Sequence, residues 1–549
     1  MTAVTLAQHA GSATRGRTLT GTGALIRLVL RRDRVRIPAW LAGLTLATVG
    51  TAGSLTQTYP TAAERQTLAA TMDSPAAVAM TGINHGAGNY TYGAMMGHQT
   101  LWFTAILVGV MSVLLLVRHT RTEEATGRAE LVRAGVVGRH APLAAALCVV
   151  VAANLAVAAL MAVGLGTGGL EGITWEGSWL YGAAHAAVGI VFAGVAAVTA
   201  QVTEHSRGAS GMGLAAVGLS YVLRAVGDVG GGALSWLSPI GWAQATQVYV
   251  TDRWWPLLPA VVVAPVLVAA AVRLSMRRDV GAGLRPPRAG PAGASGALAN
   301  PLGFAFRLHR ANLIAWAAGM GVLGVMYGSM LGEAEQWLAE IDAMAELLPD
   351  IAGAAVPETF AAMIMTVLAM ITGVYSVLAA QRLRSEETAG RAEPLLCTGL
   401  SRTRWAAGHL AVAMVGSAAV LLAAGLGMGA SGALALGDAS LLPRLLGAAV
   451  AHLPALWLII GIVAALFGVA ARAIPLTWAV VGYSFVVVYL GGLLQLPAWM
   501  NNLSPFGHIP RLPADDLTLT PLIVLTALAG GLAAAGLAVF QRRDVQSPT

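Results

Sequence analysis

The chain contains no lysine, only two cysteines and few charged residues, which make up 11% of its 549 positions. A phosphate-binding P-loop needs a lysine to reach the nucleotide phosphates, so this sequence cannot supply one. If ATP is used, another subunit must therefore bind it. Cys148 lies in an apolar run and Cys397 in a polar loop, and their pattern fits neither a zinc site nor a disulfide framework.

Apolar residues dominate what is present. They are 56% of the sequence, far above the share in soluble domains, so we predict an integral membrane protein. All 33 basic residues are arginines, and the formal net charge is +7. In a membrane protein this excess indicates cytoplasmic loops, so we expect no nucleic-acid partner. No arrangement of side chains resembles an enzyme active site, and we predict a non-catalytic chain.

Twelve apolar segments are predicted to cross the bilayer, each with roughly the 20 residues that a transmembrane helix needs. In the first half they are 37–57, 98–117, 141–164, 179–201, 209–226 and 256–274. In the second half they are 311–331, 359–380, 405–429, 445–469, 475–494 and 519–540. The predicted fold class is all-α integral membrane, with about 12 transmembrane helices.

Four sequence landmarks occur once in each half, in the same order. Arg121–Arg139 reads RTEEATGRAELVRAGVVGR, and Arg384–Arg402 reads RSEETAGRAEPLLCTGLSR. An arginine-rich stretch precedes the first span of each half and is predicted to be an amphipathic helix in the membrane interface. The arginines expected to face phosphate are Arg31 and Arg34 in the first copy and Arg307 and Arg310 in the second.

The other two landmarks lie near the end of each half. Leu-Ser-Pro at 237–239 returns at 503–505, and Arg-Arg-Asp-Val at 277–280 returns at 542–545. The pairs Ser238-Pro239 and Ser504-Pro505 are predicted to lie in external, turn-rich segments that dip into the outer leaflet. The recurrence predicts two parallel six-helix repeats. The predicted domains are a tail at 1–23, repeats at 24–280 and 301–549, and a Pro/Gly/Arg linker at 281–300.

The distribution of arginine predicts the orientation. With both termini in the cytoplasm, about 28 of the 33 arginines lie in cytoplasmic segments or their flanks. The opposite topology reverses this bias. Both termini and both glutamate-rich loops are therefore predicted to be cytoplasmic.

Each glutamate-rich loop is predicted to form a short helix on the membrane surface. Thr122 and Ser385 are good N-cap residues, and the glutamates after them suit a helix N-terminus. Glu123, Gly127 and Glu130 would share one face and leave a small notch for a partner. The predicted ion pairs, four residues apart, are Glu124 with Arg128 and Glu387 with Arg391.

The predicted spans contain essentially no carboxylates, which a proton- or sodium-driven carrier usually places in its pathway. His185 and His452 lie in or beside spans, and we interpret them as helix-packing or interface residues. The acidic residues that map to the outer side instead are Glu171, Glu176, Asp228, Glu333, Glu340, Glu358, Asp438 and Asp515.

In the order of its landmarks, the sequence resembles the membrane subunits of type-2 ABC exporters. The likeness is to the fused, double-length permeases of the actinobacterial polyketide-antibiotic and multidrug exporter group, and it covers nearly the whole chain. It rests on Leu-Arg-Arg-Asp-Arg with Phe-Arg-Leu-His-Arg, the two Glu-Glu-x-x-Gly-Arg-Ala-Glu loops and the two Leu-Ser-Pro segments. The resemblance implies a coupling helix in each loop and a re-entrant segment before the last span of each half.

The resemblance also implies a partner. ATP and magnesium would be bound by a separate ATPase dimer, and this chain would carry no cofactor. Closure of the dimer would drive export of hydrophobic or amphipathic compounds, such as antibiotics, across the bacterial plasma membrane. The similar loops imply two copies of one ATPase. The docking residues would be Glu123, Glu124, Gly127, Arg128 and Glu130, and Glu386, Glu387, Gly390, Arg391 and Glu393.

The two loops are not identical. Pro394 and Cys397 stand in the second loop where the first has Leu131 and Ala134, so we expect the second helix to end sooner. Two other functions stay open. One is a twelve-helix proton-coupled drug antiporter, which the nearly acid-free spans disfavour. The other is a membrane assembly protein that transports nothing.

Overall fold

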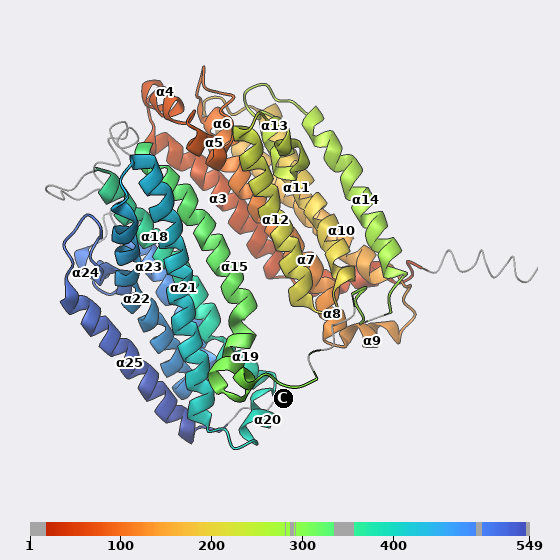
Figure 1. Ribbon diagram of the computed structural model, residues 1–549. Coiled ribbons are helices and arrows are strands. Elements are labelled where there is room, and N and C mark those ends of the chain that lie inside the picture. The colour runs from red at the N-terminus through yellow and green to blue at the C-terminus, as the bar shows by residue number, and fades with distance from the viewer. Residues whose placement is uncertain are drawn as a thin grey trace, which may run out of the picture. The chain divides into compact units, whose positions relative to one another are not determined.

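The computed structural model describes residues 18–279, 281–285, 290, 292–333, 356–489 and 497–544. Every secondary-structure element in these ranges is a helix (Figure 1). Contacts within the chain divide it into two units, Met1–Ala289 and Gly290–Thr549. The boundary falls inside the segment 281–300, which we predicted to be a linker.

The first unit is built around α11 (Trp175–Val202), which contacts four other long helices. Most residues of α11 are buried. Those neighbours are α7 (Leu101–His119), α10 (Ala141–Gly166), α12 (Ser206–Val229) and α14 (Leu258–Ser275). The other elements are α2 (Thr22–Arg32), α3 (Arg36–Thr58), α4 (Ala62–Thr71), α5 (Pro75–Thr81), α6 (Tyr92–Met95), the π-helix η1 (Met96–Thr100), α8 (Arg121–Ala125), α9 (Arg128–Arg133), η2 (Leu234–Leu237), α13 (Pro239–Ala245) and η3 (Trp255–Leu257).

The second unit is built around α22 (Leu441–Ala470), which contacts α18 (Val356–Ala380), α21 (Arg402–Leu436) and α25 (Leu519–Arg542). The helix α15 (Pro301–Ser329) packs along α21. The remaining elements are η4 (Gly296–Ala299), η5 (Leu331–Glu333), α19 (Arg382–Thr388), α20 (Ala392–Leu396), η6 (Ala471–Leu476), α23 (Thr477–Tyr489), α24 (Ala498–Asn501) and η7 (Pro505–His508).

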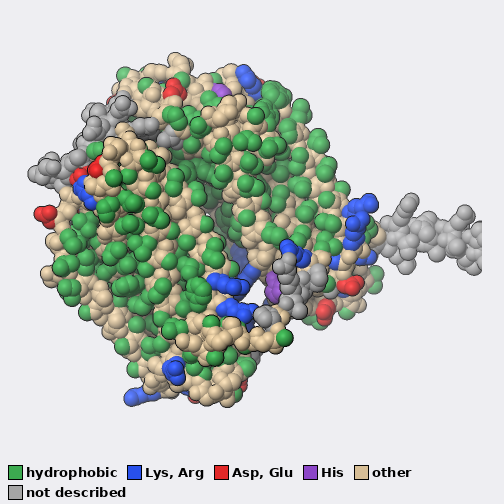
Figure 2. Space-filling view, in the orientation of Figure 1, with side chains coloured by type: hydrophobic (Ala, Val, Ile, Leu, Met, Phe, Trp, Pro, Cys, Tyr) green, Lys and Arg blue, Asp and Glu red, His purple; other side chains and the backbone are tan. Residues whose placement is uncertain are grey.

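The outer faces of the long helices are apolar, and Figure 2 shows hydrophobic side chains gathered over them. On α14 the exposed apolar residues are Leu258, Val261, Val262 and Val266, and on α25 they are Leu519, Ile523, Val524 and Leu528. Water does not favour such faces, whereas lipid chains do, and each helix satisfies its own backbone hydrogen bonds. The protein is therefore a multi-pass membrane protein.

The number of membrane spans remains a prediction. Within the described residues, ten helices are long and apolar enough to cross a membrane, or up to eleven if α2 and α3 form one bent span. One of the ten is the 48-residue run Leu441–Val488, which covers all of the predicted span 445–469 and the first part of the predicted span 475–494. The end of the second of these, 490–494, lies outside the described residues.

The two arginine-rich stretches fold differently. In the first unit α2 and α3 meet at a bend of 66°, whereas the matching stretch of the second unit lies inside the unbroken helix α15. The second stretch therefore forms no helix of its own, and its location in the membrane interface stays a prediction. Pro38 fits this break, because it lies in the first turn of α3, where its missing N–H costs no hydrogen bond, whereas an unbroken helix would lose one there. Ile314 stands at the equivalent place in α15 and carries no such restriction.

Glycines allow close contact between α22 and α25. A Cβ on Gly536 of α25 would overlap the carbonyl oxygen of Ala464 in α22, and one on Gly468 would overlap the carbonyl oxygen of Gly536. Small residues at such crossings let two backbones approach, which is how membrane helices gain packing energy without a hydrophobic effect between them.

We predict that Gly536→Ala lowers the stability of the second unit by about 1–3 kcal/mol, because the added methyl group forces α22 and α25 apart. Thermal unfolding of the purified protein in detergent measures this. Gly531→Ala is the matched control on the same helix, because a Cβ there meets no atom within 4 Å. Equal melting temperatures for the two variants would show that the crossing does not depend on Gly536.

Candidate functional site: two glutamate-rich loops

Each glutamate-rich loop folds as two short helices rather than one. In the first unit α8 and α9 are separated by Gly127, which has a φ of 74°. In the second unit α19 and α20 are separated by a turn containing Gly390, with a φ of 69°. This left-handed backbone suits glycine and ends a right-handed helix. Glu123, Gly127 and Glu130 therefore do not share a helical face, and the predicted notch is wrong.

The predicted N-caps are also wrong. Thr122 is the second residue of α8, and Ser385 lies in the middle of α19, where its hydroxyl donates to the carbonyl of Arg382. The short helices follow almost directly from the long helices α7 and α18. N–H groups in their first turn donate to backbone carbonyls at that junction. The Glu124 N–H, for example, donates to the carbonyl oxygen of Thr120 at 3.2 Å. A side-chain cap is therefore not needed.

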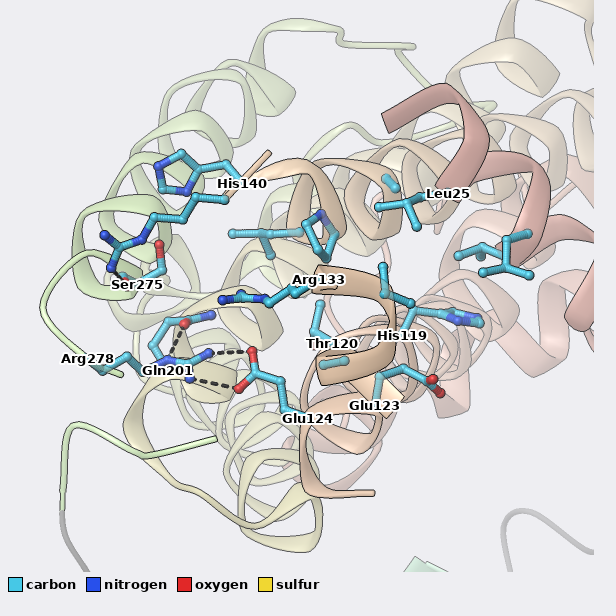
Figure 3. Close-up of a pocket in the computed structure, with 18 of the residues that line it drawn as sticks. Leu25, His119, Thr120, Glu123, Glu124, Arg133, His140, Gln201, Ser275 and Arg278 are labelled. Atoms are coloured by element: carbon cyan, nitrogen blue, oxygen red, sulfur yellow. Dashed lines mark hydrogen bonds and ion pairs between the residues drawn. The ribbon is translucent and has the colours of Figure 1, made fainter. Parts of the chain in front are cut away.

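The second glutamate of each loop is held by an arginine from the far end of its unit. Arg278 Nη1 donates to Glu124 Oε2 at 2.7 Å, and Arg278 Nη2 donates to Glu124 Oε1 at 2.8 Å (Figure 3). In the second unit Arg543 Nη2 donates to both oxygens of Glu387 at 2.8 Å. We call these two contacts the glutamate–arginine clamps. The structure does not form the predicted ion pairs of Glu124 with Arg128 and of Glu387 with Arg391, so that prediction is wrong.

The clamps join equivalent residues. Glu124 and Glu387 occupy the same place in the two loops, and Arg278 and Arg543 occupy the same place in the repeated Arg-Arg-Asp segment that follows α14 or ends α25. The Glu387 side chain is 1% exposed and that of Glu124 is 11% exposed, so each carboxylate needs a cation to offset its lost hydration. Each loop is thereby fixed to the end of the last long helix of its unit.

Further groups surround each clamp. In the first unit the fully buried Arg121 donates to Glu124 Oε2 at 2.6 Å and to the carbonyl of Gly281 at 3.0 Å. In the second unit the Arg543 guanidinium lies over the rings of Phe467 and Phe540, 5.0 and 5.4 Å from their centroids. Both clamps thus combine charge pairing with burial, which strengthens a hydrogen bond to an ionised group.

The first glutamate of each loop has a different partner in each unit. Glu123 accepts from Arg32 of α2 at 2.5 Å, which ties the loop to the helix ahead of α3. Glu386 accepts from Arg382 at 2.9 Å and from Arg391 at 2.6 Å, so it stays within its own loop. The hydrogen bond to Glu386 raises the pKa of Arg391 above its ordinary value.

The remaining predicted docking residues face solvent or lie near it. Arg128 and Glu130 are exposed in the first loop, and Arg391 and Glu393 are exposed in the second, while Gly127 and Gly390 are half-buried. The expectation that the second helix ends sooner is wrong, because α9 ends at Arg133 and α20 at Leu396, which are equivalent positions. Pro394 lies in the first turn of α20, where a missing N–H costs no hydrogen bond.

The four arginines predicted for the membrane interface, Arg31, Arg34, Arg307 and Arg310, are all exposed. Both serine–proline pairs begin short helices. Ser238 accepts from the Gly241 N–H at 3.2 Å at the start of α13, and Ser504 accepts from the Phe506 N–H at 3.3 Å at the start of η7. Pro239 and Pro505 each follow as the first helical residue. Their placement in the outer leaflet stays a prediction.

Sequence reasoning missed two kinds of residue at these loops. Arg278 and Arg543 belong to the repeated Arg-Arg-Asp-Val landmark, and its recurrence in the same order as the glutamate-rich loops is the signal in the sequence for a contact between them. Asp33 lies in the arginine-rich stretch ahead of the first span, and its sequence neighbours give no sign of burial. It is in fact fully buried between α2 and α3, where it accepts from His119 Nε2 at 2.6 Å and from Arg118 Nε at 3.1 Å.

Two comparisons with known proteins agree with this architecture of a multi-pass membrane protein. Residues 298–541 match the family described as "Multidrug efflux system permease Rv1217c, C-terminal domain". The chain is 39% identical over 541 residues to the multidrug efflux system permease protein Rv1217c of Mycobacterium tuberculosis (strain ATCC 25618 / H37Rv), covering 97% of this chain and 96% of that protein. The chain belongs to this family of multidrug efflux permeases.

We predict that Glu124→Gln loosens the first glutamate-rich loop, because it leaves the cations of Arg121 and Arg278 without their counter-charge. Removing one member of a buried pair typically costs about 3–5 kcal/mol. Hydrogen exchange of the amides at 121–133 should therefore speed up by about tenfold or more.

Glu130→Gln is the matched control, since it makes the same change at an exposed position of the same loop. Exchange that is equally slow in both variants would contradict the role of the clamp.

Proposed function

We propose that the protein is the membrane subunit of an ATP-driven exporter of hydrophobic or amphipathic compounds in the bacterial plasma membrane, with both termini cytoplasmic. Family membership supports export of drugs. ATP and magnesium would bind to a separate ATPase dimer, made of two copies of one protein. In this proposal the chain itself is non-catalytic, and its glutamate-rich loops are the coupling helices.

The observation that carries the coupling role is the pair of clamps. A loop that receives force from a partner must be fixed to the helices that it moves, since a loosely attached loop would absorb the motion. Glu124 is fixed to Arg278 after α14, and Glu387 to Arg543 after α25. A push on either loop would therefore reach the last long helix of its unit directly.

The residues of each loop divide into two roles in this proposal. Glu124 and Glu387 hold the loop and are too buried to form the docking surface themselves. The exposed charges offered to the ATPase are Arg128 and Glu130 in the first loop and Arg391 and Glu393 in the second. Charged groups at the edge of an interface steer association and set partner choice.

The proton-coupled antiporter has one observation in its favour. Asp33 and His119 form a buried carboxylate–imidazole pair, a type of group that carries protons in some transporters. The pair lies at the bend between α2 and α3 and also contacts Arg118, which favours a structural role. Other helix carboxylates have arginine partners too, as Asp228 has Arg224 and Glu358 has Arg444. A membrane assembly protein without flux has no specific observation in its favour.

We predict that reversing the exposed charges, with Glu130→Arg and Glu393→Arg together, weakens ATPase binding by about tenfold or more, because in this proposal each glutamate faces a cation of the ATPase, which an arginine would repel. Co-purification of ATPase subunits with the tagged chain measures binding, and efflux of a fluorescent hydrophobic dye from cells measures transport. Both should fall together.

Glu176→Arg is the matched control, since it reverses an exposed glutamate at the start of α11, outside the loops. Dye efflux that continues without any ATPase and stops when the proton gradient is collapsed would favour the antiporter. Unchanged ATPase binding in the double variant would show that Glu130 and Glu393 do not contribute to the docking surface.

A further inference from the structure

A pocket of about 110 Å³ lies between the first glutamate-rich loop and the helix ahead of α3 (Figure 3). Its walls come from α2, α9 and the start of α10, with residues after α14 closing one side. One part of the lining is apolar and consists of Leu25, Leu28, Val29, Val132 and Leu143. The volume holds a small polar group, and a longer chain attached to that group would have to leave along the outside of α2.

The other part of the lining carries basic side chains. Arg133 from α9 and the neighbouring Arg139 and His140 all line the pocket. Among the described residues, none of the three has a carboxylate partner at ion-pair distance, and Arg139 donates instead to the carbonyl of Ser275 at 3.1 Å. Burial, and then the charges of Arg139 and Arg133, lower the pKa of His140. The two arginines therefore lie close enough to act on the same imidazole, and an anion placed among the three side chains would offset the two charges.

The acidic residues that line the same pocket are already engaged or lie in solvent. Glu123 is paired with Arg32, and Glu124 is paired with Arg278. Asp279 is exposed at the edge. The lining therefore combines an apolar wall with two arginines that form no ion pair among the described residues, which is the chemistry that recognises an anionic amphiphile.

The pocket is closed by contacts at both ends of α2. The N–H groups of Gly138 and His140 donate to the carbonyls of Thr20 and Thr18, at 2.9 and 3.0 Å, ahead of the helix. At the other end Arg32 binds Glu123. The helix also keeps Leu28 and Leu30 exposed, as suits a helix that lies against lipid. Lipid is therefore the nearest source of an amphiphile for this pocket.

We propose that this pocket binds an anionic phospholipid, with its phosphate on Arg133, Arg139 and His140 and its acyl chain along Leu25 and Leu28. The site is particular to the first unit, because Leu396 and Thr403 stand where the first unit has Arg133 and His140. Bound lipid would join α2 to the coupling helix α9. The proposal does not depend on the ATPase, because it concerns only this chain and the bilayer.

Titration of the purified full-length protein in detergent with short-chain phosphatidylglycerol or phosphatidylcholine tests the site by thermophoresis. The wild type should bind phosphatidylglycerol more tightly than phosphatidylcholine. Arg133→Leu, which copies the second unit, should weaken phosphatidylglycerol binding about fivefold and leave phosphatidylcholine binding unchanged. Arg133→Lys keeps the charge and should retain binding.

Arg128→Leu is the matched control, since it removes the same charge from the same helix at an exposed position outside the pocket. Equal losses in Arg128→Leu and Arg133→Leu would overturn the proposal, because the effect would then be one of general charge. Inorganic phosphate that competes as well as the lipid would also overturn it, since the site would then hold a free anion.

Discussion

The glutamate–arginine clamps are the contacts on which the candidate coupling surface depends. A carboxylate that loses most of its water needs a cation close by, and each loop obtains one from the end of the last long helix of its unit. In the first loop Arg121, a sequence neighbour, adds a second cation to Glu124. Once Glu124 and Glu387 are held, the short helices α9 and α20 present the other charges of the loop outward. The two predicted pairs, Glu124 with Arg128 and Glu387 with Arg391, do not form, because a glycine with positive φ breaks the helix between the two charges.

The two units share these clamps and differ in how the first long helix begins. In the first unit Pro38 and the buried Asp33 accompany a sharp bend, and Arg32 ties the short helix α2 to the loop. In the second unit α15 runs without a break, and His309 stands at the place of Asp33, with its ring nitrogen 3.2 Å from that of His409. The glutamate-rich loop is therefore joined to a separate helix in the first unit only, which gives the two loops different mechanical surroundings.

Polar contacts inside the helix bundles repeat as well. His185 of α11 approaches the Thr104 hydroxyl at 2.7 Å, and His452 of α22 approaches the Thr366 hydroxyl at 3.3 Å. In both cases the other ring nitrogen lies 2.8 Å from the carbonyl four residues earlier in the helix. Both rings thus bridge neighbouring helices with their polar atoms satisfied, as buried polar groups require.

The sequence by itself determined the membrane class, the positions of the long helices and the recurrence of the landmarks, because apolar runs and repeated motifs are local patterns that need no knowledge of contacts. It also located the two glutamate-rich loops. Only the tertiary structure decided which partners the charges take, since Arg278 lies 154 residues from Glu124 and Arg543 lies 156 residues from Glu387. Spacing along one helix does not show which cation from a distant part of the sequence will lie beside a carboxylate. It also does not show that a carboxylate such as Asp33 will be buried and so require a cation.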